Sequence, residues 1–445
     1  MGNSEQSNCS EILKIVRTLS AENQPITPPP AGPMLLWTGV GFAPLAPDDI
    51  QALRTLGLNQ HLPLLQDFDE TARTLDQAGA PLQLMEGLKR FPLPTSEGSY
   101  DFFPEKPQDS FNLASWRKVG ELIRERLSHY QELNLTISSL WLDYEGYPFS
   151  SPFLNEQTPP SAQQVNVDDW PAYRRQFALN IASTYIAAPA REVYPHITTL
   201  NWLVNLSFPQ APIINALGQP TPSSGPSFFS HSNPYAYGNT LAYEKSELPF
   251  DLPQKAVDLF YLKLLIQHTS IDASNRQAAA PYIGSIPWVA RIVRDSKNSE
   301  IPTMSRSAYR EALRHLWLRD IDSMLIFNAP YLTPDEHQAE IQDACDVWRI
   351  LEPFGSLLKD GYACELGFPE DTCNQVIWSG MADSQSALIH LTTWDNQTPS
   401  IAEITVWNKI YQIKMPKSGG KTVRIWRQYG SLNFDAITVL NAYQL

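Results

Sequence analysis

The sequence predicts an α/β protein: a (β/α) TIM-like barrel followed by a C-terminal antiparallel β-sandwich domain. Strand-like and helix-like segments alternate between residues 34 and 358, which is the signature of parallel β/α architecture. After residue 361 the helical periodicity gives way to short β-prone runs separated by Gly, Ser, Asn and Asp. At 445 residues the chain is too long for one ordinary core, so a barrel-sized domain and a smaller one are expected.

Three segments follow from this pattern. Residues 1–33 are predicted to form an N-terminal helix and a Pro-rich lead-in, because the run Thr27-Pro28-Pro29-Pro30 continues neither a helix nor a central strand. Residues 34–360 form the barrel, and residues 361–445 form the sandwich. An open doubly wound sheet is the alternative, but the sequence has no Gly-x-Gly-x-x-Gly after the first strand.

Each element of the predicted barrel has its own local pattern. The strand candidates are apolar runs at residues 34–37, 82–85, 138–147, 196–203, 228–231, 282–289 and 323–327. The helix candidates, with apolar residues at helical spacing, are 111–133, 168–193, 254–271, 305–319 and 335–358. Seven strands are consistent with an eight-stranded barrel in which one strand is missing or disguised.

Composition restricts the class of partner. The formal charge of −14 opposes binding to nucleic acids, and a neutral substrate fits better. The 12 Trp and 18 Tyr residues offer aromatic faces for sugar rings. No stretch approaches the roughly 20 apolar residues of a membrane span, and no secretion signal is recognised. We expect a secreted or periplasmic protein whose signal is absent from this chain.

The four cysteines, Cys9, Cys345, Cys364 and Cys373, include no Cys-x-x-Cys pair, so neither a metal site nor a cofactor is predicted. Cys364 and Cys373 flank a turn-rich segment and form either a local disulfide or free thiols.

The most informative segment is Leu140-Trp141-Leu142-Asp143-Tyr144-Glu145-Gly146-Tyr147-Pro148. In a strand, residues i and i+2 point to the same face, so Asp143 and Glu145 point into the barrel if the leucines pack against the outer helices. Catalytic groups of such barrels lie at the carboxyl ends of strands. Two neighbouring acids also disfavour joint ionisation, which raises one pKa towards that of a general acid.

An inward Asp-x-Glu at the end of a central strand resembles the glycoside hydrolases that use the 2-acetamido group of their substrate as nucleophile, notably the hyaluronidases and, more distantly, the chitinases. The resemblance implies that Glu145 protonates the leaving oxygen and that Asp143 stabilises the acetamido group, with net retention. Tyr144 matches the hyaluronidase arrangement, whereas Gly146-Tyr147-Pro148 replaces the Glu-x-Trp-Arg-Pro that often follows, and Ser138 and Trp141 replace further chitinase aspartates.

If the sugar lacks a 2-acetamido group, a second carboxylate is needed, at about 5 Å for a retaining enzyme and about 6.5–9.5 Å for an inverting one. Glu86, which ends the preceding strand before Gly87, is the candidate. A polar contact or a salt bridge is its alternative role.

Other polar and aromatic residues fall where strands run into loops, as a carbohydrate cleft requires. We expect the following to contact an oligosaccharide or polysaccharide substrate: Trp37, Tyr147, Trp202, Asn205, His231, Asn233, Tyr235, Tyr237, Trp288 and Asn328.

Two other classes stay open. The chain is alternatively a non-catalytic carbohydrate-binding protein on a barrel scaffold, or a metal-dependent hydrolase with Asp143 and Glu145 as ligands. The second alternative is weakened because no His-x-His accompanies a strand end. The basic residues Arg310, Arg314, His315 and Arg319 recur at helical spacing and are predicted to form a solvated helix face.

Overall fold

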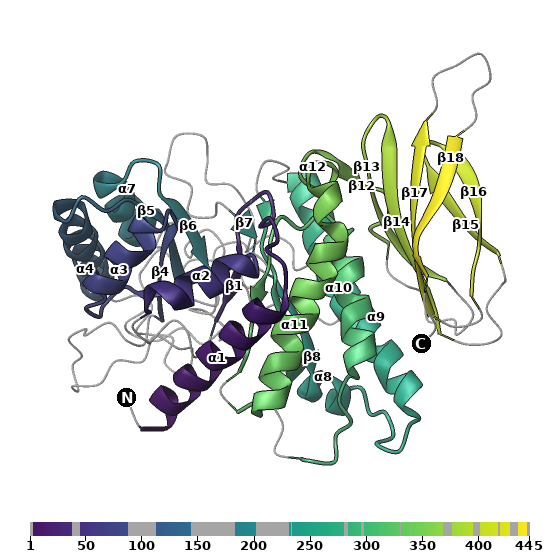
Figure 1. Cartoon of the computed structure of the whole chain (residues 1–445), viewed down its shortest axis with the longest axis horizontal. Helices are drawn as coiled ribbons and strands as arrows, with labels where there is room; N and C mark the ends of the chain where they lie inside the picture. The colour runs from purple at the N-terminus through teal and green to yellow at the C-terminus, as the bar shows by residue number, and fades with distance from the viewer. Residues whose placement is uncertain are drawn as a thin grey trace, which may run out of the picture.

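The fold was analysed in a computed structural model of the whole chain (Figure 1). The structure describes residues 3–37, 45–87, 113–143, 183–201, 231–232, 234–279, 284–294, 298–329, 331–367, 376–394, 401–416, 419–427 and 435–442. Parallel strands and their helices form one side of the molecule, and antiparallel strands form the other. The chain is therefore a mixed α/β protein with both kinds of sheet.

The parallel strands form two hydrogen-bonded groups. The first has the order β2 (Leu58–Gln60), β1 (Met34–Leu36), β11 (Leu325–Ile326), β10 (Trp288–Val293) and β8 (Tyr235–Asn239). The second has the order β3 (Leu62–Pro63), β4 (Leu82–Gly87), β5 (Ile137–Asp143) and β6 (Thr198–Asn201). All their pairings are parallel, so the carboxyl ends within each group meet at one edge.

The two groups join at a strand that the sequence pattern did not reveal. Only His61 separates β2 from β3, so one short segment pairs with β1 through its first half and with β4 through its second. Its sequence, Leu58-Asn59-Gln60-His61-Leu62-Pro63, mixes polar and apolar residues. This segment is a parallel strand in addition to the seven that the sequence predicts. Its polar residues explain why it lacks the apolar pattern of a buried strand.

The remaining neighbours are β7 (His231–Ser232), which leads into β8, and β9 (Gly284–Ser285), which leads into β10 and pairs with β7 in parallel. Strand β6 lies beside β7. Within the described ranges no hydrogen-bonded ladder joins these two strands. The described residues thus include eight parallel segments that follow one another in chain order, and the junction of β6 with β7 is made by contact without a ladder.

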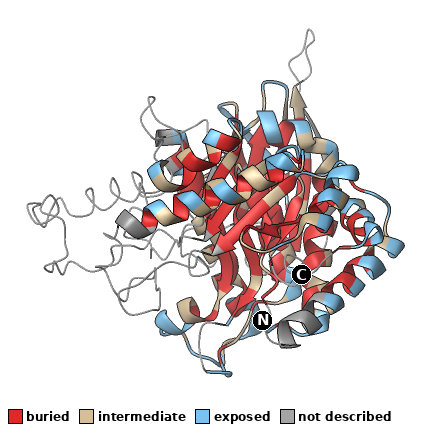
Figure 2. Cartoon of the chain, turned by 90° about the vertical axis from the view of Figure 1, so that its left-hand side faces the viewer, coloured by how far each residue is buried: buried red, intermediate tan, exposed pale blue. Residues whose placement is uncertain are grey.

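Helices cover the outer face of these strands (Figures 1 and 2). They are α1 (Asn3–Glu22), α2 (Pro47–Thr55), α3 (Asp69–Gln77), α4 (Leu113–Glu132), the π-helical turn η4 (Ser183–Ala187), α7 (Ala188–Val193), α8 (Thr240–Lys245), α9 (Gln254–Ala279), α10 (Arg306–Trp317), α11 (Pro334–Leu351), the 3₁₀ turn η5 (Glu352–Phe354) and α12 (Gly355–Asp360). Within the described residues, none combines the length and apolar character of a membrane-crossing helix.

Alternating side chains divide the parallel strands into two faces. Leu36, Leu84 and Leu140 belong to a large core that they share with the helices, which we call the helix-side core. The opposite face forms a second apolar group, the inner cluster. Its members are Leu35, Met85, Trp141, Leu200, Tyr237, Ile286, Trp288, Ala290, Val293 and Leu325, with Trp37, Tyr235 and Phe327 packed against them. The inner cluster therefore draws on both strand groups, which share one apolar face.

Caps fix the helices that matter for the sites below. The side chain of Ser305 accepts a hydrogen bond from the backbone N–H of Ala308 and starts α10. Thr333 and Glu336 form a capping box at the start of α11, with Pro334 as its first helical residue. These are standard start signals, and both helices begin within one residue of the sequence prediction.

The C-terminal part is antiparallel. One sheet has the order β12 (Tyr362–Ala363), β13 (Ile377–Ala382), β14 (Ser386–Thr393), β17 (Gly419–Arg427) and β18 (Asp435–Ala442). Strands β15 (Ile401–Val406) and β16 (Lys409–Lys414) form a separate hairpin. Residues of both, such as Ile389, Ile404 and Val423, share one hydrophobic cluster, the C-terminal core.

The prediction of a solvated face on α10 is wrong. His315 is fully buried, and the side chains of Arg314 and Arg319 are nearly so. Their helix packs against β13 and β14, and helical periodicity alone does not reveal that a distant sheet covers this face. Arg310 is half-buried.

Candidate functional site

Strand β5 carries the predicted catalytic segment to the carboxyl edge of the parallel strands. Leu140 and Leu142 lie in the helix-side core, and Trp141 lies in the inner cluster. This is the division of faces that the sequence predicts. Asp143 is the last residue of β5 and pairs with Gly87 of β4. Alternation puts position 143 on the strand face of Trp141, while the Asp143 side chain lies outside the described part.

Five aromatic rings gather in the inner cluster, on strands of the first group or directly after them. Trp37 follows β1, and its ring centroid lies 4.7 Å from that of Trp288. Trp288 also contacts Phe327 at 5.2 Å and Tyr235 at 5.3 Å. Tyr235 and Tyr237 stack at 4.8 Å. The structure therefore brings together four residues that the sequence analysis assigned to substrate binding, and adds Phe327 to them.

The strands that carry Tyr235, Tyr237 and Trp288 reach further along the chain than predicted. Tyr235 and Tyr237 lie within β8, and Trp288 is the first residue of β10, so the expectation that they fall where strands run into loops is wrong. Trp288 pairs with Tyr235, and Tyr237 pairs with Ala290 two residues further along β10, so the rings occupy two successive levels of the interior. Trp37 and Tyr235 are partly exposed, and Trp288 is buried. These five rings, which we call the aromatic floor, keep some exposed surface at Trp37 and Tyr235.

Glu86 has a different environment. Its strand position has the parity of Leu82 and Leu84, which face the helix-side core. The carboxylate is buried and accepts a hydrogen bond from the backbone N–H of Leu65, with an N to Oε2 distance of 3.2 Å. At least one contact of Glu86 therefore ties the end of β4 to the chain after β3.

His61 is a residue of the interior that the sequence analysis missed. Its ring is 1% exposed and lies 5.2 Å from the ring of Trp141, edge to face. Within the described residues neither ring nitrogen has a hydrogen-bond partner. Burial lowers the pKa of His61 to about 3, so the ring is neutral at pH 7. No sequence signal marked this position, because His61 follows the polar residues Asn59 and Gln60.

Several predicted residues cannot be placed. Glu145, Tyr147, Trp202, Asn205 and Asn233 lie outside the described residues, and His231 is described only by its backbone in β7. Asn328 follows β11 and is fully buried. The aromatic floor and the end of β5 are thus the described parts of the candidate site.

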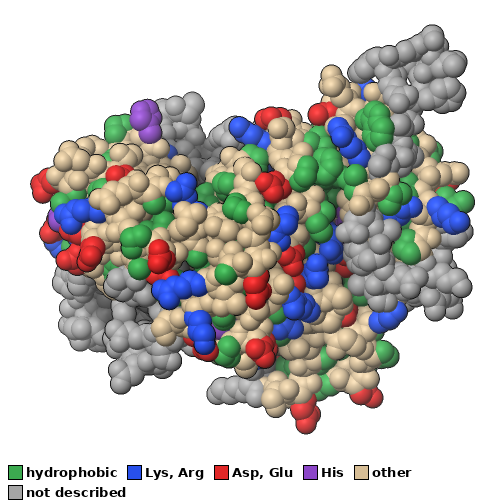
Figure 3. Space-filling view, viewed as in Figure 1, with side chains coloured by type: hydrophobic (Ala, Val, Ile, Leu, Met, Phe, Trp, Pro, Cys, Tyr) green, Lys and Arg blue, Asp and Glu red, His purple; other side chains and the backbone are tan. Residues whose placement is uncertain are grey.

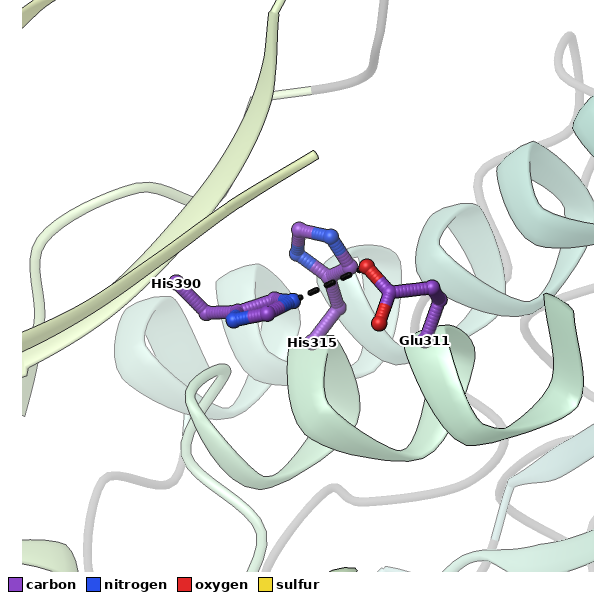
Figure 4. Close-up of side chains that lie close together, drawn as sticks. All are labelled: Glu311, His315 and His390. Carbon is purple, nitrogen blue, oxygen red and sulfur yellow. Dashed lines mark hydrogen bonds and ion pairs between the residues drawn. The ribbon is translucent and has the colours of Figure 1, made fainter. Parts of the chain in front are cut away.

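A second polar centre lies between α10 and the C-terminal sheet (Figure 4). Glu311 and His315, one helical turn apart on α10, point towards His390 of β14, and all three are fully buried. One potential ligand atom from each lies within 4.8 Å of the others. By residue type this trio can hold a divalent metal ion such as zinc.

Hydrogen bonds already use these atoms. The Thr392 hydroxyl donates to Oε2 of Glu311 at 2.6 Å. Because that hydroxyl has one proton, it accepts from Nε2 of His315 at 2.8 Å. Nδ1 of His315 then accepts from the Ser379 hydroxyl, which in turn accepts from Nε of Arg319. The network is complete without an ion.

Burial and neighbouring charges shift the pKa values of this centre. Burial raises the pKa of the Glu311 carboxyl, but His390, Arg314 and the Thr392 hydroxyl outweigh burial and leave the pKa below its usual value. Burial and the neighbouring His390 place the pKa of His315 well below its usual value. Burial also lowers the pKa of Arg319 to about 10. Glu311 is therefore ionised and His315 neutral at pH 7.

No protein-family model and no curated protein matches the chain. Among solved structures, it is similar to a GH29 α-L-fucosidase from Bacteroides thetaiotaomicron, with 9% identity over 86% of this chain and 79% of that one and a TM-score of 0.34. A GH30 endoxylanase from Clostridium papyrosolvens matches with 9% identity over 93% and 95% and a TM-score of 0.36. A GH36 α-galactosidase from Geobacillus stearothermophilus matches with 10% identity over 92% and 55% and a TM-score of 0.40. At such scores the folds superpose only in part, so function is argued from the chain's own residues.

Proposed function

We propose that the chain is a glycoside hydrolase that cleaves O-glycosidic bonds with Glu145 as general acid/base. The observation that carries this proposal is the division of β5, whose Trp141 faces the interior while Leu140 and Leu142 face the helices. We infer that the same alternation continues past Asp143, so that both acids of the Asp-x-Glu pair face the interior. Within the aromatic floor, Trp37, Tyr235 and Trp288 supply the stacking faces that a sugar ring needs.

The proposed reaction is substrate-assisted and retaining. Glu145 protonates the glycosidic oxygen, the 2-acetamido oxygen of the substrate attacks the anomeric carbon, and Asp143 stabilises the positive charge on the acetamido nitrogen. Water, deprotonated by Glu145, then opens the oxazoline. Neighbouring carboxylates raise the pKa of one of them, which keeps Glu145 protonated for the first step.

The proposed scaffold is a closed (β/α) barrel over residues 34–360, followed by a β-sandwich over residues 361–445. Its support is the series of eight parallel segments in chain order together with the inner cluster shared by both strand groups. Catalytic residues of barrels lie at the carboxyl ends of strands, and Asp143 is the last residue of β5. The hairpin β15–β16 and the five-stranded sheet share the C-terminal core and support the sandwich.

The test is hydrolysis of aryl glycosides and oligosaccharides, with 2-acetamido sugars beside plain hexosides. We expect turnover of 2-acetamido substrates by the native chain, and a loss of at least 10²-fold in kcat for Glu145→Gln, as general acid catalysis requires. Glu132→Gln, at the end of α4, is the matched control and should keep full turnover. Absence of turnover on every substrate would contradict the proposal and leave a binding protein.

The alternative proposal, with Glu86 as second carboxylate, predicts a different experimental result. Turnover of plain hexosides that is lost in Glu86→Gln while the variant keeps its melting temperature would favour it. The hydrogen bond between Glu86 and the backbone of Leu65 predicts instead that Glu86→Gln lowers the melting temperature.

A further inference from the structure

A cavity of about 480 Å³ lies between the end of the helical part and the C-terminal sheet. It is lined by residues of η5 and α12 on one side and by the β13–β14 turn and β17 on the other, including Phe354, Leu357, Asp383, Gln385, Arg424 and Trp426. Its volume is within the range of about 300–1,000 Å³ that small-ligand pockets occupy. None of these residues belongs to the proposed catalytic site.

The side chains of β17 alternate between the two faces of the sheet, and one face lines the pocket. Val423 and Ile425 are buried in the C-terminal core, so Arg424 and Trp426 are on the opposite face of the sheet. Arg424 pairs across the ladder with Leu388, which packs in the helix-side core. In Figure 3, hydrophobic and basic side chains lie side by side over the region where Figure 1 labels α12 and β13.

The guanidinium group of Arg424 lies over two aromatic rings. It is 5.8 Å from the ring centroid of Phe354 and 5.8 Å from that of Trp426. Its side chain is exposed, and within the described ranges it makes no ion pair. The pocket therefore offers an exposed guanidinium cation to a ligand.

Asp383, the acid among the lining residues, has a structural role. Oδ1 of Asp383 accepts hydrogen bonds from the backbone N–H groups of Gln385 and Ser386, both at 2.6 Å, and so closes the β13–β14 turn. Arg427 stacks on Trp407 at 4.5 Å and donates to the backbone oxygen of Ser384. Two arginines against one aspartate give the pocket a positive charge in a chain whose formal charge is −14.

We propose that this pocket binds a carboxylate-bearing sugar unit, such as the uronate of an acidic oligosaccharide. A planar carboxylate matches the two parallel N–H groups of a guanidinium, and the rings of Phe354 and Trp426 can take the apolar face of a sugar. The saccharide assignment rests on the proposed function. The pocket then holds an acidic polysaccharide at a second point while the carboxyl edge of the parallel strands acts on the chain.

The experiment is calorimetric titration of the full chain carrying Glu145→Gln, which prevents turnover, with tri-galacturonate and with neutral cellotriose. We expect tri-galacturonate to bind at least tenfold more tightly than cellotriose. Addition of Arg424→Gln should weaken tri-galacturonate binding at least tenfold, and so should Trp426→Ala. Arg117→Gln, which removes an exposed arginine from α4, should leave it unchanged. Melting temperatures confirm that each variant folds.

Three results would overturn the inference: equal affinity for tri-galacturonate and cellotriose, unchanged affinity in Arg424→Gln, or tighter binding of a sulfated trisaccharide than of the uronate. The outcome is independent of catalysis. Arg424-dependent binding supports the pocket even if the native chain hydrolyses nothing, and Arg424→Gln in the native background should keep the turnover of small aryl glycosides.

Discussion

Nε2 of His390 lies 3.1 Å from Oε2 of Glu311, in a contact that joins the last strands of the chain to helix α10. Both residues are fully buried. Oε1 of Glu311 accepts from Arg314 at 2.6 Å, and Oε2 also accepts from Thr392. A buried carboxylate with this many donors is stabilised only while all of them are present.

Replacement of Glu311 by alanine should therefore destabilise the protein strongly. It leaves Arg314 and His390 buried without their acid, and breaking a buried charged pair costs about 3–5 kcal/mol. We expect a loss of that size in the free energy of unfolding, measured by urea denaturation. The exposed pair of Glu121 with Lys118 is the control, and Glu121→Ala should change stability by less than about 0.5 kcal/mol. Equal effects of the two variants would contradict the role of the buried centre.

Acid should destabilise the same buried centre. His315 is neutral when folded because its pKa lies well below its usual value, whereas the unfolded chain titrates near pH 6.5. Below that pH the unfolded state binds a proton that the folded state rejects, so stability falls as pH decreases. The lowered pKa of Glu311 adds a further loss at more acidic pH, when its carboxylate is protonated.

The measurement is the melting temperature between pH 8 and pH 4 for the native chain and His315→Gln. The variant should melt lower at pH 8, because one hydrogen bond is lost, but its melting temperature should fall less between pH 6.5 and pH 5. Parallel curves for the two proteins would show that His315 does not carry the acid response.

A divalent metal should not stabilise this centre. Glu311, His315 and His390 have the right chemistry, but the Thr392 hydroxyl lies 2.6 Å from Oε2 of Glu311 and 2.8 Å from Nε2 of His315. Binding of an ion would break both hydrogen bonds. We expect neither a chelator nor added zinc to change the melting temperature. A rise of several degrees with zinc would assign the centre to a metal, because a ligand that binds the folded state stabilises it.

The sequence predicted the helices with strong periodicity and the strands that are continuous apolar runs, such as Met34–Leu36 and the Leu325–Ile326 pair. It could not predict the strand broken at His61, since its polar residues interrupt the apolar pattern. The faces of β5 followed from alternation alone. Burial of His315 and Arg319 could not be predicted, because it depends on a sheet more than sixty residues further along, as the contact of His315 with Ser379 shows.

The aromatic floor was also predictable only in part. Trp37, Tyr235, Tyr237 and Trp288 were predicted from their residue types, yet their convergence depends on the parallel register of β1, β8, β10 and β11. Phe327 joins them because it stacks on Trp288 and Tyr237, and no sequence signal separates it from an ordinary core residue. Residue type in the sequence was enough to predict four of the five rings. Which rings contact each other depends on how the strands pair.

Glu340 on α11 is a protonated acid whose removal should stabilise the protein. It is fully buried, its Oε1 accepts from the backbone N–H of Arg291 at 3.2 Å, and its Oε2 has no partner among the described residues. Burial raises its pKa to about 8. The unfolded chain loses this proton near pH 4.5, so stability declines as pH rises from there to about 8. Glu340→Gln keeps the accepting oxygen and removes this cost, which is about 3 kcal/mol at pH 7 from the value per pKa unit.

We therefore expect Glu340→Gln to match the native chain below pH 4.5 and to exceed it increasingly up to pH 8, in urea denaturation across that range. Glu336→Gln, one turn earlier on the same helix, should do the opposite. Hydrogen bonds from Thr333 and Arg294 help to hold the pKa of Glu336 below its usual value although burial raises it, so its loss should cost about 1 kcal/mol at neutral pH. A Glu340→Gln variant that is less stable than the native chain at pH 7 would mean that the buried acid is ionised and bound to a partner.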